Sequence, residues 1–400
     1  MSVRISQRFT LPSGQEAAQR WRWNSRARGN MAVMTSRLLA AIALFAIAIA
    51  SASAQQPAGR VAIVGLEHGH VVGFLHEFPR QHDAQLVGIV DSDHALCARY
   101  QREFHLDPSL FYNTIDDLFA HQHPQALLVY TNIAEHRRVI EAAAAHGVDA
   151  MVEKPLTISL ADALAIRRAA REHHIQVLVN YETTWYASNA AIYDLLQQGR
   201  LGDIRKVIIR DGHQGPKEIG VQPEFLQWLT DPALDGAGAL YDFGCYGADL
   251  MTWFMHGATP ISVTAVAQTD KPEIYPHIDD DATIVLRYPH TQAVLLPSWN
   301  WTFAVKDTQV YGTKAYAIAD NGTHLRERFS ESSPEESLTA PPLASPQDSS
   351  LHYLAAVIRG QLVPKGDLTA LDTNIIVMQI LDAARESVRT GKTILLHPLP

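Results

Sequence analysis

This sequence has very little cysteine and no excess of positive charge. Its two cysteines, Cys97 and Cys245, are too few and too far apart for a disulfide framework, and they lack the spacing of a zinc site. Lysine and arginine number 33 against 42 aspartates and glutamates, for a net charge of −9. Nucleic-acid binding needs a basic surplus to replace phosphate counterions, so we exclude a nucleic-acid partner. A chain of 400 residues is expected to form two domains.

The N-terminal apolar run is too short to cross a membrane. Residues 38–50 fall below the roughly 20 residues that a spanning helix needs. The run follows Arg37 and precedes Ala-Ser-Ala at 52–54, the pattern of a secretory signal peptide. We therefore expect residues 1–54 to be a leader and signal peptide, and the mature chain to be periplasmic or extracellular without a membrane span. The alternative is an uncleaved amphipathic anchor. No paired arginines precede the run, so export of the folded protein is not indicated.

From residue 60 onward, short apolar runs alternate with helical stretches. Runs that are apolar throughout are typical of parallel strands buried on both faces by helices. They lie at 60–65, 84–91, 125–130, 148–153 and 175–180. We predict an α/β domain at 60–180, with a doubly wound Rossmann sheet that binds a dinucleotide.

The regular alternation of predicted strands and helices ends after about residue 180. The expected strands lie at 206–212, 261–268, 282–288, 293–299 and 308–312, and the expected helices at 187–199, 238–256, 350–359 and 370–390. Tight turns such as "YPHTQ" and "YGTKA" join neighbouring strands, which requires antiparallel pairing. Residues 181–400 should thus form an α+β domain with an open, largely antiparallel sheet. Residues 324–350, rich in Ser, Pro and Glu, are interpreted as a solvated excursion.

The first strand leads into "VGLEHGHVVGF", where a dinucleotide site would need closely spaced glycines. Gly65 stands at the first required position, but Glu67 and His70 occupy the second and third, so the G-x-G-x-x-G fingerprint fails as written. Gly69 and Gly73 leave a looser spacing that a structural turn would explain equally well. Glu67 would repel a diphosphate unless its carboxylate points away.

Asp91 gives better support for a dinucleotide. It ends the second strand, where an acid accepts hydrogen bonds from a ribose hydroxyl. Residues 92–94 supply no Arg or Lys for a 2′-phosphate, so NAD is favoured over NADP; an ordinary strand-end aspartate is the alternative. The residues predicted to contact the coenzyme are Gly65, Leu66, Glu67, His68, Asp91, Thr131, Asn132, His136, Glu153 and Lys154.

The segment "DGAGALYDFGCYGADLMTWF" predicts a largely buried helix with acids on it. Asp242, Tyr246 and Asp249 are spaced i, i+4, i+7 and would project from one face. Gly244 and Gly247 lower helix stability by about 1 kcal/mol each relative to alanine, which makes sense if a ring or a facing strand approaches the backbone. A polar solvent face with small residues is the alternative.

Lys154, in "MVEKPLT" at the tip of a buried strand, is useful only if it faces a partner. A lysine on one domain and Asp242 with Tyr246 on the other could meet across a cleft. Oxidation of a carbinol needs a base for the hydroxyl proton, and a nearby ammonium would lower the pKa of a tyrosine from its usual value near 10. We therefore predict Lys154, Asp242 and Tyr246 as the catalytic group, with Asp242 orienting Lys154 or the substrate.

Four motifs together resemble the Gfo/Idh/MocA family of NAD(P)-dependent oxidoreductases. They are "EKP" (153–155), "GAGALYDFGCYGADL", "VYGTKA" (310–315) and "ARESVRTGKTILL", and the resemblance covers about residues 60–400. It implies a coenzyme on the first domain, a homo-oligomer formed through the open sheet, and the lysine and aspartate roles at Lys154 and Asp242. Tyr246 stands where many members have histidine, which is similar to the branch of glucose-fructose oxidoreductase, xylose dehydrogenase and dihydrodiol dehydrogenase, in which tyrosine is the proposed acid/base.

The residues that line the substrate pocket are the part of the site that the sequence indicates least clearly. Tyr181, Trp185 and His213 are interpreted as its lining, with Asp242 contacting the substrate, although a lone histidine is often structural. Glu182 stands where the family often has a basic residue. The histidines share no metal-ligand spacing on one element, so we expect no metal.

The favoured interpretation is an exported NAD-dependent oxidoreductase acting on a sugar or related polyol. Free NAD is scarce outside the cytoplasm, so the coenzyme would be tightly bound and recycled by a second substrate. One alternative is a redox-neutral NAD-dependent glycosidase of the same superfamily, in which hydride leaves and returns within one turnover. The other is a sugar-binding or scaffold protein without coenzyme, which Glu67 favours and the group of Lys154, Asp242 and Tyr246 disfavours.

Overall fold

A computed structural model describes residues 58–399 of the chain. The predicted signal peptide lies outside the described residues. Among residues 58–399, no helix combines the length and the apolar character that crossing a bilayer requires.

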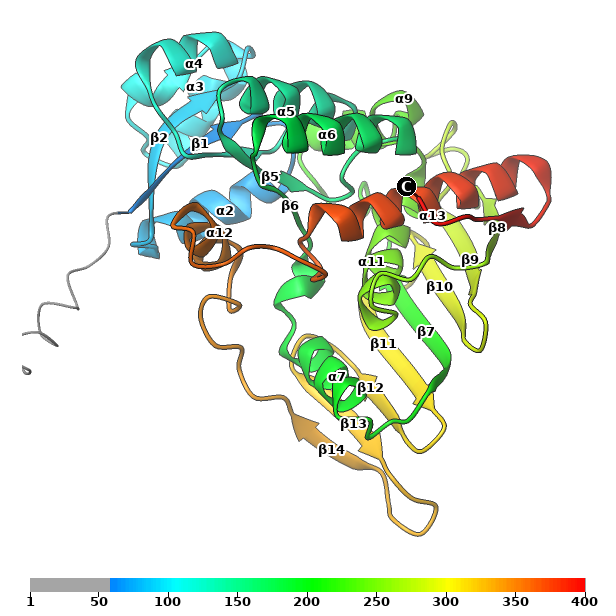
Figure 1. Cartoon of the computed structure of the whole chain (residues 1–400). Coiled ribbons are helices and arrows are strands. Elements are labelled where there is room, and N and C mark those ends of the chain that lie inside the picture. The colour runs from blue at the N-terminus through cyan, green and yellow to red at the C-terminus, as the bar shows by residue number, and fades with distance from the viewer. Residues whose placement is uncertain (1–57, 400) are drawn as a thin grey trace, which may run out of the picture. The chain divides into compact units, whose positions relative to one another are not determined.

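The first sheet has six parallel strands in the order β3-β2-β1-β4-β5-β6 (Figure 1). The strands are β1 (Gly59–Val64), β2 (Ala84–Val90), β3 (Phe111–Tyr112), β4 (Ala126–Val129), β5 (Asp149–Glu153) and β6 (Val177–Asn180). The order reverses between β1 and β4, which is where doubly wound sheets bind ligands. The predicted Rossmann sheet is confirmed.

Helices cover both faces of this sheet. One face carries α2 (His70–Glu77), α3 (His94–Glu103) and α12 (Ser350–Ile358), and the other carries α4 (Ile115–His121), α5 (His136–Ala145) and α6 (Leu160–His173). Short 3-10 turns lie at Phe78–Arg80, Pro108–Leu110, Ile133–Glu135 and Glu182–Trp185. Leu351, Leu354 and Val357 of α12 share one buried cluster with Val71 and Leu75 of α2, so a late segment of the chain completes the first core. With both faces covered, the carboxyl edge of the strands is left for ligands.

The second sheet has nine strands in the order β14-β13-β12-β11-β7-β10-β9-β8-β15. They are β7 (Ile204–Gly212), β8 (Ser262–Gln268), β9 (Asp281–Arg287), β10 (Gln292–Ser298), β11 (Val305–Gly312), β12 (Tyr316–Ala319), β13 (His324–Arg328), β14 (Glu336–Thr339) and β15 (Ile394–Leu395). Neighbouring strands pair antiparallel except β7 and β10, which pair in parallel. The predicted open, largely antiparallel sheet is confirmed.

Strands β13 and β14 correct one prediction, because they lie within the segment interpreted as a solvated excursion. Leu325 is buried against the sheet, while its neighbour Arg326 forms ion pairs with Asp320 and Glu335. A strand with charged residues and a single inward side chain has only a weak β-strand pattern in the sequence, so the composition of this segment suggested a loop.

The helix predicted at 238–256 is broken in two. α10 (Gly238–Asp242) ends at Phe243, and α11 (Gly244–Phe254) begins just after it. A Cβ added at Gly244 would lie 3.0 Å from Cδ1 of Ile284 in β9, and one at Gly247 would lie 2.9 Å from Cδ2 of Leu295 in β10. The expected close approach of a facing strand is therefore confirmed, but the single continuous face for Asp242, Tyr246 and Asp249 is wrong.

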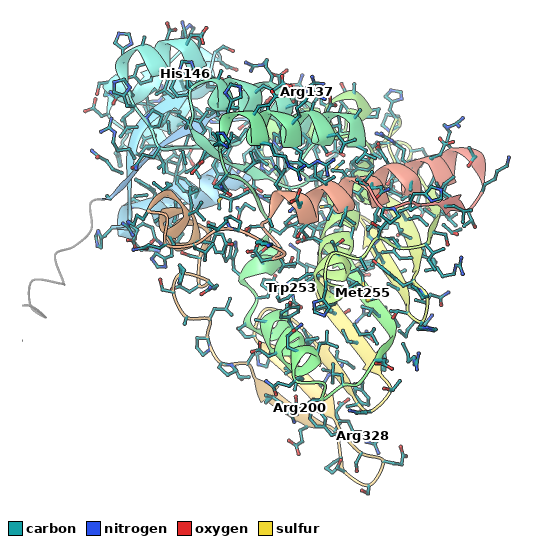
Figure 2. All side chains as sticks on the ribbon, in the orientation of Figure 1. Arg137, His146, Arg200, Trp253, Met255 and Arg328 are labelled. Carbon is teal, nitrogen blue, oxygen red and sulfur yellow. The ribbon has the colours of Figure 1, made fainter. Side chains whose placement is uncertain are left out.

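The remaining helices connect the two sheets and their loops. They are α7 (Ala187–Gln197), α8 (Pro223–Leu229), α9 (Pro232–Asp235) and α13 (Leu371–Thr390). α13 contacts α6 of the first domain and both α11 and β8 of the second. Trp253 at the end of α11 stacks on Tyr193 of α7, with ring centroids 3.9 Å apart (Figure 2). α11 is thereby fixed on several sides, and it carries Tyr246.

Candidate active site

Lys154 and Asp242 meet in a buried contact between the two domains. Lys154 follows the last residue of β5, and Asp242 is the last residue of α10. The Lys154 Nζ donates a hydrogen bond to the main-chain oxygen of Asp242 at 3.1 Å and forms an ion pair with the Asp242 carboxylate. The second carboxylate oxygen of Asp242 accepts a hydrogen bond from Nε1 of Trp299 at 2.9 Å. The predicted convergence of this lysine and this aspartate is present.

The pair is charged at neutral pH. Burial lowers the pKa of Lys154, but the adjacent Asp242 raises it, and the net pKa lies above that of a free lysine. Burial likewise raises the pKa of Asp242, whereas Lys154 lowers it, so that the net pKa lies below the usual value. A buried ion pair persists when each charge has a close partner and further hydrogen bonds, as here.

Tyr246 lies beside this pair. The Lys154 Nζ is 5.2 Å from the centroid of the Tyr246 ring, and the Nζ of Lys306 is 4.5 Å from it. Tyr181 contacts the same ring edge-on, with centroids 5.5 Å apart. The three residues predicted as the catalytic group are thus brought together.

The ionisation expected of Tyr246 is wrong. Burial raises its pKa well above 10, and the carboxyl groups of Asp211, Glu182 and Asp242 raise it further. The charge of Lys154 is neutralised by Asp242, so it does not stabilise a phenolate. Tyr246 is therefore a protonated phenol at neutral pH, suited to donating a proton.

Two ionisable residues near Tyr246, Lys306 and Asp211, were not predicted from the sequence. Lys306 in β11 forms an ion pair with Glu182, and it lies opposite Asp211 in the pairing of β11 with β7. Asp211 is buried, its Oδ1 has no hydrogen-bond partner among the described residues, and burial raises its pKa to about 8. An aspartate at an inward position of the apolar strand "KVIIRDG" was the available signal.

The three residues interpreted as pocket lining have different surroundings. Tyr181 is fully buried and its hydroxyl donates to Oδ1 of Asn374 at 2.8 Å, so it supports Tyr246 from behind instead of lining a cavity. His213 packs edge-on against Phe243 with centroids 4.9 Å apart, and burial lowers its pKa. Trp185 lines a cavity, and its Nε1 donates to Oδ1 of Asn180 at 3.1 Å.

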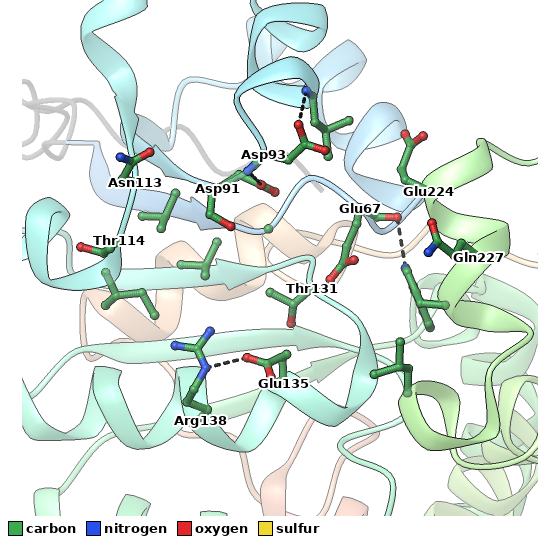
Figure 3. A pocket seen from close by; sticks show the side chains of 18 residues that line it. Glu67, Asp91, Asp93, Asn113, Thr114, Thr131, Glu135, Arg138, Glu224 and Gln227 are labelled. Atoms are coloured by element: carbon green, nitrogen blue, oxygen red, sulfur yellow. Dashed lines mark hydrogen bonds and ion pairs between the residues drawn. The ribbon is translucent and has the colours of Figure 1, made fainter.

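Two cavities open at the carboxyl edge of the first sheet. The first cavity, of about 560 Å³, lies at the tips of β1, β2 and β4 (Figure 3). Its polar lining includes Glu67, Asp91, Asp93, Asn113, Thr114, Thr131, Glu135, Arg138, Glu224 and Gln227. The second cavity, of about 620 Å³, lies near the tips of β4, β5 and β6 and is lined by His70, Glu153, Asn180, Glu182, Trp185 and residues 349–351, among others.

The loop after β1 is held by its own side chains. Gly65 has a φ of +87°, and a Cβ there would lie 2.6 Å from the Thr131 nitrogen, so this turn requires glycine. The Leu66 amide donates to Oδ2 of Asp91 at 2.8 Å. The Oε1 of Glu67 accepts hydrogen bonds from the main-chain and side-chain nitrogens of Asn132, both at 2.9 Å. Burial raises the pKa of Glu67 and of Asp91.

Two of the predicted coenzyme contacts are buried histidines. Burial lowers the pKa of His68 well below 6.5, and its ring packs on Phe225 and Trp228. His136 is fully buried, and its Nδ1 donates to the main-chain oxygen of Leu156 at 3.1 Å. His136 therefore positions the segment after Lys154 from beneath, and its burial leaves it no surface for a coenzyme.

Helix α8 of the second domain covers the loop. A Cβ at Gly69 would lie 2.6 Å from Cδ1 of Phe225. Nε1 of Trp228 donates to the Glu67 main-chain oxygen at 3.2 Å, and Glu224 forms an ion pair with Arg99 of α3. This cover was not predicted, because "PEFLQWL" has only the pattern of a short amphipathic helix.

The chain matches known proteins over both domains. Residues 59–181 match the oxidoreductase family with an NAD-binding Rossmann fold, and residues 189–318 match the GFO/IDH/MocA C-terminal domain. The chain is similar to trans-1,2-dihydrobenzene-1,2-diol dehydrogenase of Macaca fuscata fuscata, with 22% identity over 226 residues, or 56% of this chain and 63% of that protein. The match therefore spans less than two thirds of that relative's length.

Solved structures show the same fold. Aldose-aldose oxidoreductase from Caulobacter crescentus, complexed with glycerol, superposes with a TM-score of 0.73 at 22% identity, covering 85% of this chain and all of that one. An inositol dehydrogenase homolog from Azotobacter vinelandii, complexed with NAD+, gives a TM-score of 0.73 at 20% identity, covering 85% of this chain and 98% of that one.

Proposed function

Because this chain belongs to the Gfo/Idh/MocA family of oxidoreductases, whose first domain binds NAD, we propose that it transfers hydride between NAD and a carbinol carbon of a sugar or related polyol. The observation that carries the proposal is the buried contact of Lys154 with Asp242 beside the Tyr246 ring. It places a fixed cation and a proton-bearing phenol together near the carboxyl edge of the Rossmann sheet.

The described residues fit a dinucleotide at the first cavity. Gly65 allows the close turn, and Asp91 offers a carboxylate where a ribose hydroxyl would bind. Glu67 hydrogen-bonds Asn132, and its raised pKa weakens its repulsion of a diphosphate. Thr131 would contact the coenzyme from the tip of β4.

The diphosphate of the coenzyme would approach the loop after β1, whose amides already have hydrogen-bond partners. The amides of Leu66 and His68 already donate to Asp91 and to the Tyr130 oxygen, and Phe225 lies against Gly69. Entry of the coenzyme thus requires α8 or the loop to move. This supports a tightly held coenzyme.

NAD is proposed over NADP. Around the first cavity, the carboxyl groups of Asp91 and Asp93 stand near the expected ribose, and Arg138 is the cation of the lining but is engaged by Glu135 (Figure 3). A 2′-phosphate would face carboxylates without a free guanidinium to bind it.

Tyr246 and Lys154 would have different roles at the reacting carbon. Bound NAD supplies or accepts the hydride. Tyr246, protonated at neutral pH, donates a proton to the carbonyl oxygen during reduction. During oxidation the hydroxyl proton passes to the minor phenolate form of Tyr246. Lys154, held protonated and in place by Asp242, would donate a hydrogen bond that orients the same oxygen.

The surrounding polar groups support a polyhydroxylated substrate. Glu182 and Lys306 form a second ion pair beside Tyr246, and Asp211 has an unpartnered oxygen. Sugar hydroxyls both donate and accept hydrogen bonds, so they can pair with this mixture of groups.

The redox-neutral glycosidase is retained as the second candidate because of the α8 cover. A coenzyme that cannot exchange readily suits a reaction in which hydride returns to the same substrate. It equally suits an oxidoreductase that reduces a second substrate before the coenzyme leaves.

We also propose export of the mature chain after cleavage at Ala54 and assembly into a homo-oligomer through the open sheet. N-terminal sequencing of protein from the producing cell, and light scattering of the purified protein, test these two points.

The proposed reaction is tested by incubating purified protein with NAD and a panel of sugars, polyols and aryl glycosides. NADH formation from a free sugar supports the oxidoreductase, whereas release of an aryl leaving group without net NADH supports the glycosidase. If no member of the panel gives either product while NAD is bound, the proposed substrate class is wrong.

A further inference from the structure

Two histidines and a glutamate from different elements meet at the edge of the second cavity. His68 lies in the loop after β1, His70 begins α2, and Glu153 ends β5. One ligand atom of each lies within 4.8 Å of the other two. The His70 Nδ1 is 2.8 Å from Oε2 of Glu153, and the two imidazole rings are 4.6 Å apart. We propose that these three side chains bind a divalent transition-metal ion of the zinc class.

The donor set is chemically suited to such an ion. Two imidazole nitrogens and one carboxylate oxygen form the three-ligand set of catalytic zinc sites, which leave the fourth position to water or substrate. With metal–ligand bonds of about 2.0–2.2 Å, tetrahedral ligand atoms lie roughly 3.3–3.6 Å apart. The ligand atoms here lie within 4.8 Å of one another, so side-chain rotations that move these atoms by roughly an ångström would reach that arrangement.

A second layer of hydrogen bonds orients the carboxylate. The Nδ2 of Asn180 donates to Oε1 of Glu153 at 3.0 Å, and the Nε1 of Trp185 donates to Oδ1 of Asn180 at 3.1 Å. This leaves Oε2 directed at His70. Outer hydrogen bonds of this kind fix ligand geometry in metal sites.

The charge of Glu153 also calls for a cation. Its side chain is 3% exposed, and its ion-pair partner among the described residues is the imidazole of His70. The ammonium of the adjacent residue, Lys154, forms its ion pair with Asp242. A bound dication would supply the charge that a buried carboxylate needs.

The site faces space for a ligand. His70 and Glu153 line the second cavity together with Asn180, Glu182 and Trp185. An oxygen of a small molecule in this cavity would take the fourth position. The inference goes beyond the proposed function, because hydride transfer at Lys154 and Tyr246 does not require the ion.

Cobalt titration tests the proposal without coenzyme or substrate. Chelator-treated full-length mature protein is titrated with Co²⁺, and the visible absorption bands of bound cobalt are followed, with zinc as competitor. We expect one ion per chain. His70→Ala and Glu153→Gln should each weaken binding at least about 100-fold, since loss of even an outer-shell partner costs about 10–100-fold. His76→Ala, which removes an exposed histidine from the same helix, should bind like the unaltered protein.

Three outcomes would overturn the site. They are no cobalt binding, equal binding in both ligand variants, and loss of binding in His76→Ala. His70 is 46% exposed, so its replacement should leave folding intact, which circular dichroism checks. NADH formation is measured separately, so failure of the metal site and failure of the proposed oxidation are distinguishable.

Discussion

Lys154 and Asp242, 88 residues apart in the sequence, form a buried ion pair that joins the Rossmann domain to the second domain. The pair fixes the orientation of the Lys154 side chain and removes most of its influence on the ionisation of Tyr246. One contact therefore serves both the packing of the domains and the chemistry of the site.

Lys154→Ala should reduce turnover strongly and destabilise the fold. Removing one partner of a buried ion pair leaves an uncompensated charge and typically costs about 3–5 kcal/mol. We expect kcat to fall by about 10²–10³, the effect of removing one hydrogen-bond donor to the reacting oxygen, and the urea midpoint to fall clearly. Lys392→Ala, an exposed lysine, is the control and should change neither. Full activity in the Lys154 variant would exclude it from the reaction.

Tyr246→Phe should reduce turnover by about 10²–10⁴ without weakening coenzyme binding. The phenol hydroxyl is the group removed, and the ring contacts with Tyr181 remain. Stopped-flow kinetics measures the chemical step, and NADH fluorescence measures binding. A rate close to that of the unaltered enzyme would assign the proton to another residue.

The pH dependence should differ between the two directions of reaction. Because the pKa of Tyr246 lies well above 10, the fraction of phenolate grows about tenfold per pH unit below that value. Oxidation should therefore speed up with rising pH throughout the neutral range, while reduction stays flat. Initial rates in both directions check this, and a plateau in oxidation near pH 7 would contradict it.

Asp91→Ala should weaken NAD binding by about 10–100-fold, the effect of losing a hydrogen bond to a charged group. Affinity for NADP should fall less, because the carboxylate opposes a 2′-phosphate. Fluorescence titration with both coenzymes measures the ratio, with the exposed Asp116→Ala as control. If the affinities for NAD and NADP fell by the same factor, Asp91 would not determine which coenzyme is preferred.

Asp211→Asn should stabilise the protein at pH 8 but not at pH 4. Burial raises the folded-state pKa to about 8, whereas an unfolded aspartate titrates near 3.9. Between these values the folded state holds a proton that the unfolded state has lost, so the free energy of unfolding falls as pH rises and levels off above pH 8. We expect a gain in Tm of about 2 °C or more at pH 8. Thermal melts measure the Tm of this variant and of a control, exposed Asp203→Asn, across the pH range. If the two curves of Tm against pH were parallel, the pKa of Asp211 would not be raised.

Glu224→Gln should speed coenzyme release several-fold. The change removes the ion pair with Arg99 that ties α8 to α3 over the first cavity. Release is followed by displacing bound NADH with excess NAD in a stopped-flow fluorimeter. Exposed Glu103→Gln on α3 serves as the control. An unchanged rate would show that α8 does not limit exchange.

Much of the fold was readable from the chain. Apolar strands separated by helices predicted the Rossmann sheet, because strands buried on both faces leave a continuous apolar pattern. Short turns predicted the antiparallel pairs of the second sheet. The pairing of β13 with β14 was missed because β13 is a charged strand with one inward residue, Leu325, and has no such pattern.

The sequence by itself also determined three members of the candidate site, Lys154, Asp242 and Tyr246, since "EKP" and the segment around Asp242 and Tyr246 carry residue types that need partners when buried. Only the tertiary structure decided what those residues do to one another. It set the protonated state of Tyr246, the break at Phe243, the cover formed by α8 and the meeting of His68 and His70 with Glu153. Ionisation and ligand geometry depend on distance and burial between segments far apart in the chain, and local residue patterns do not encode those distances.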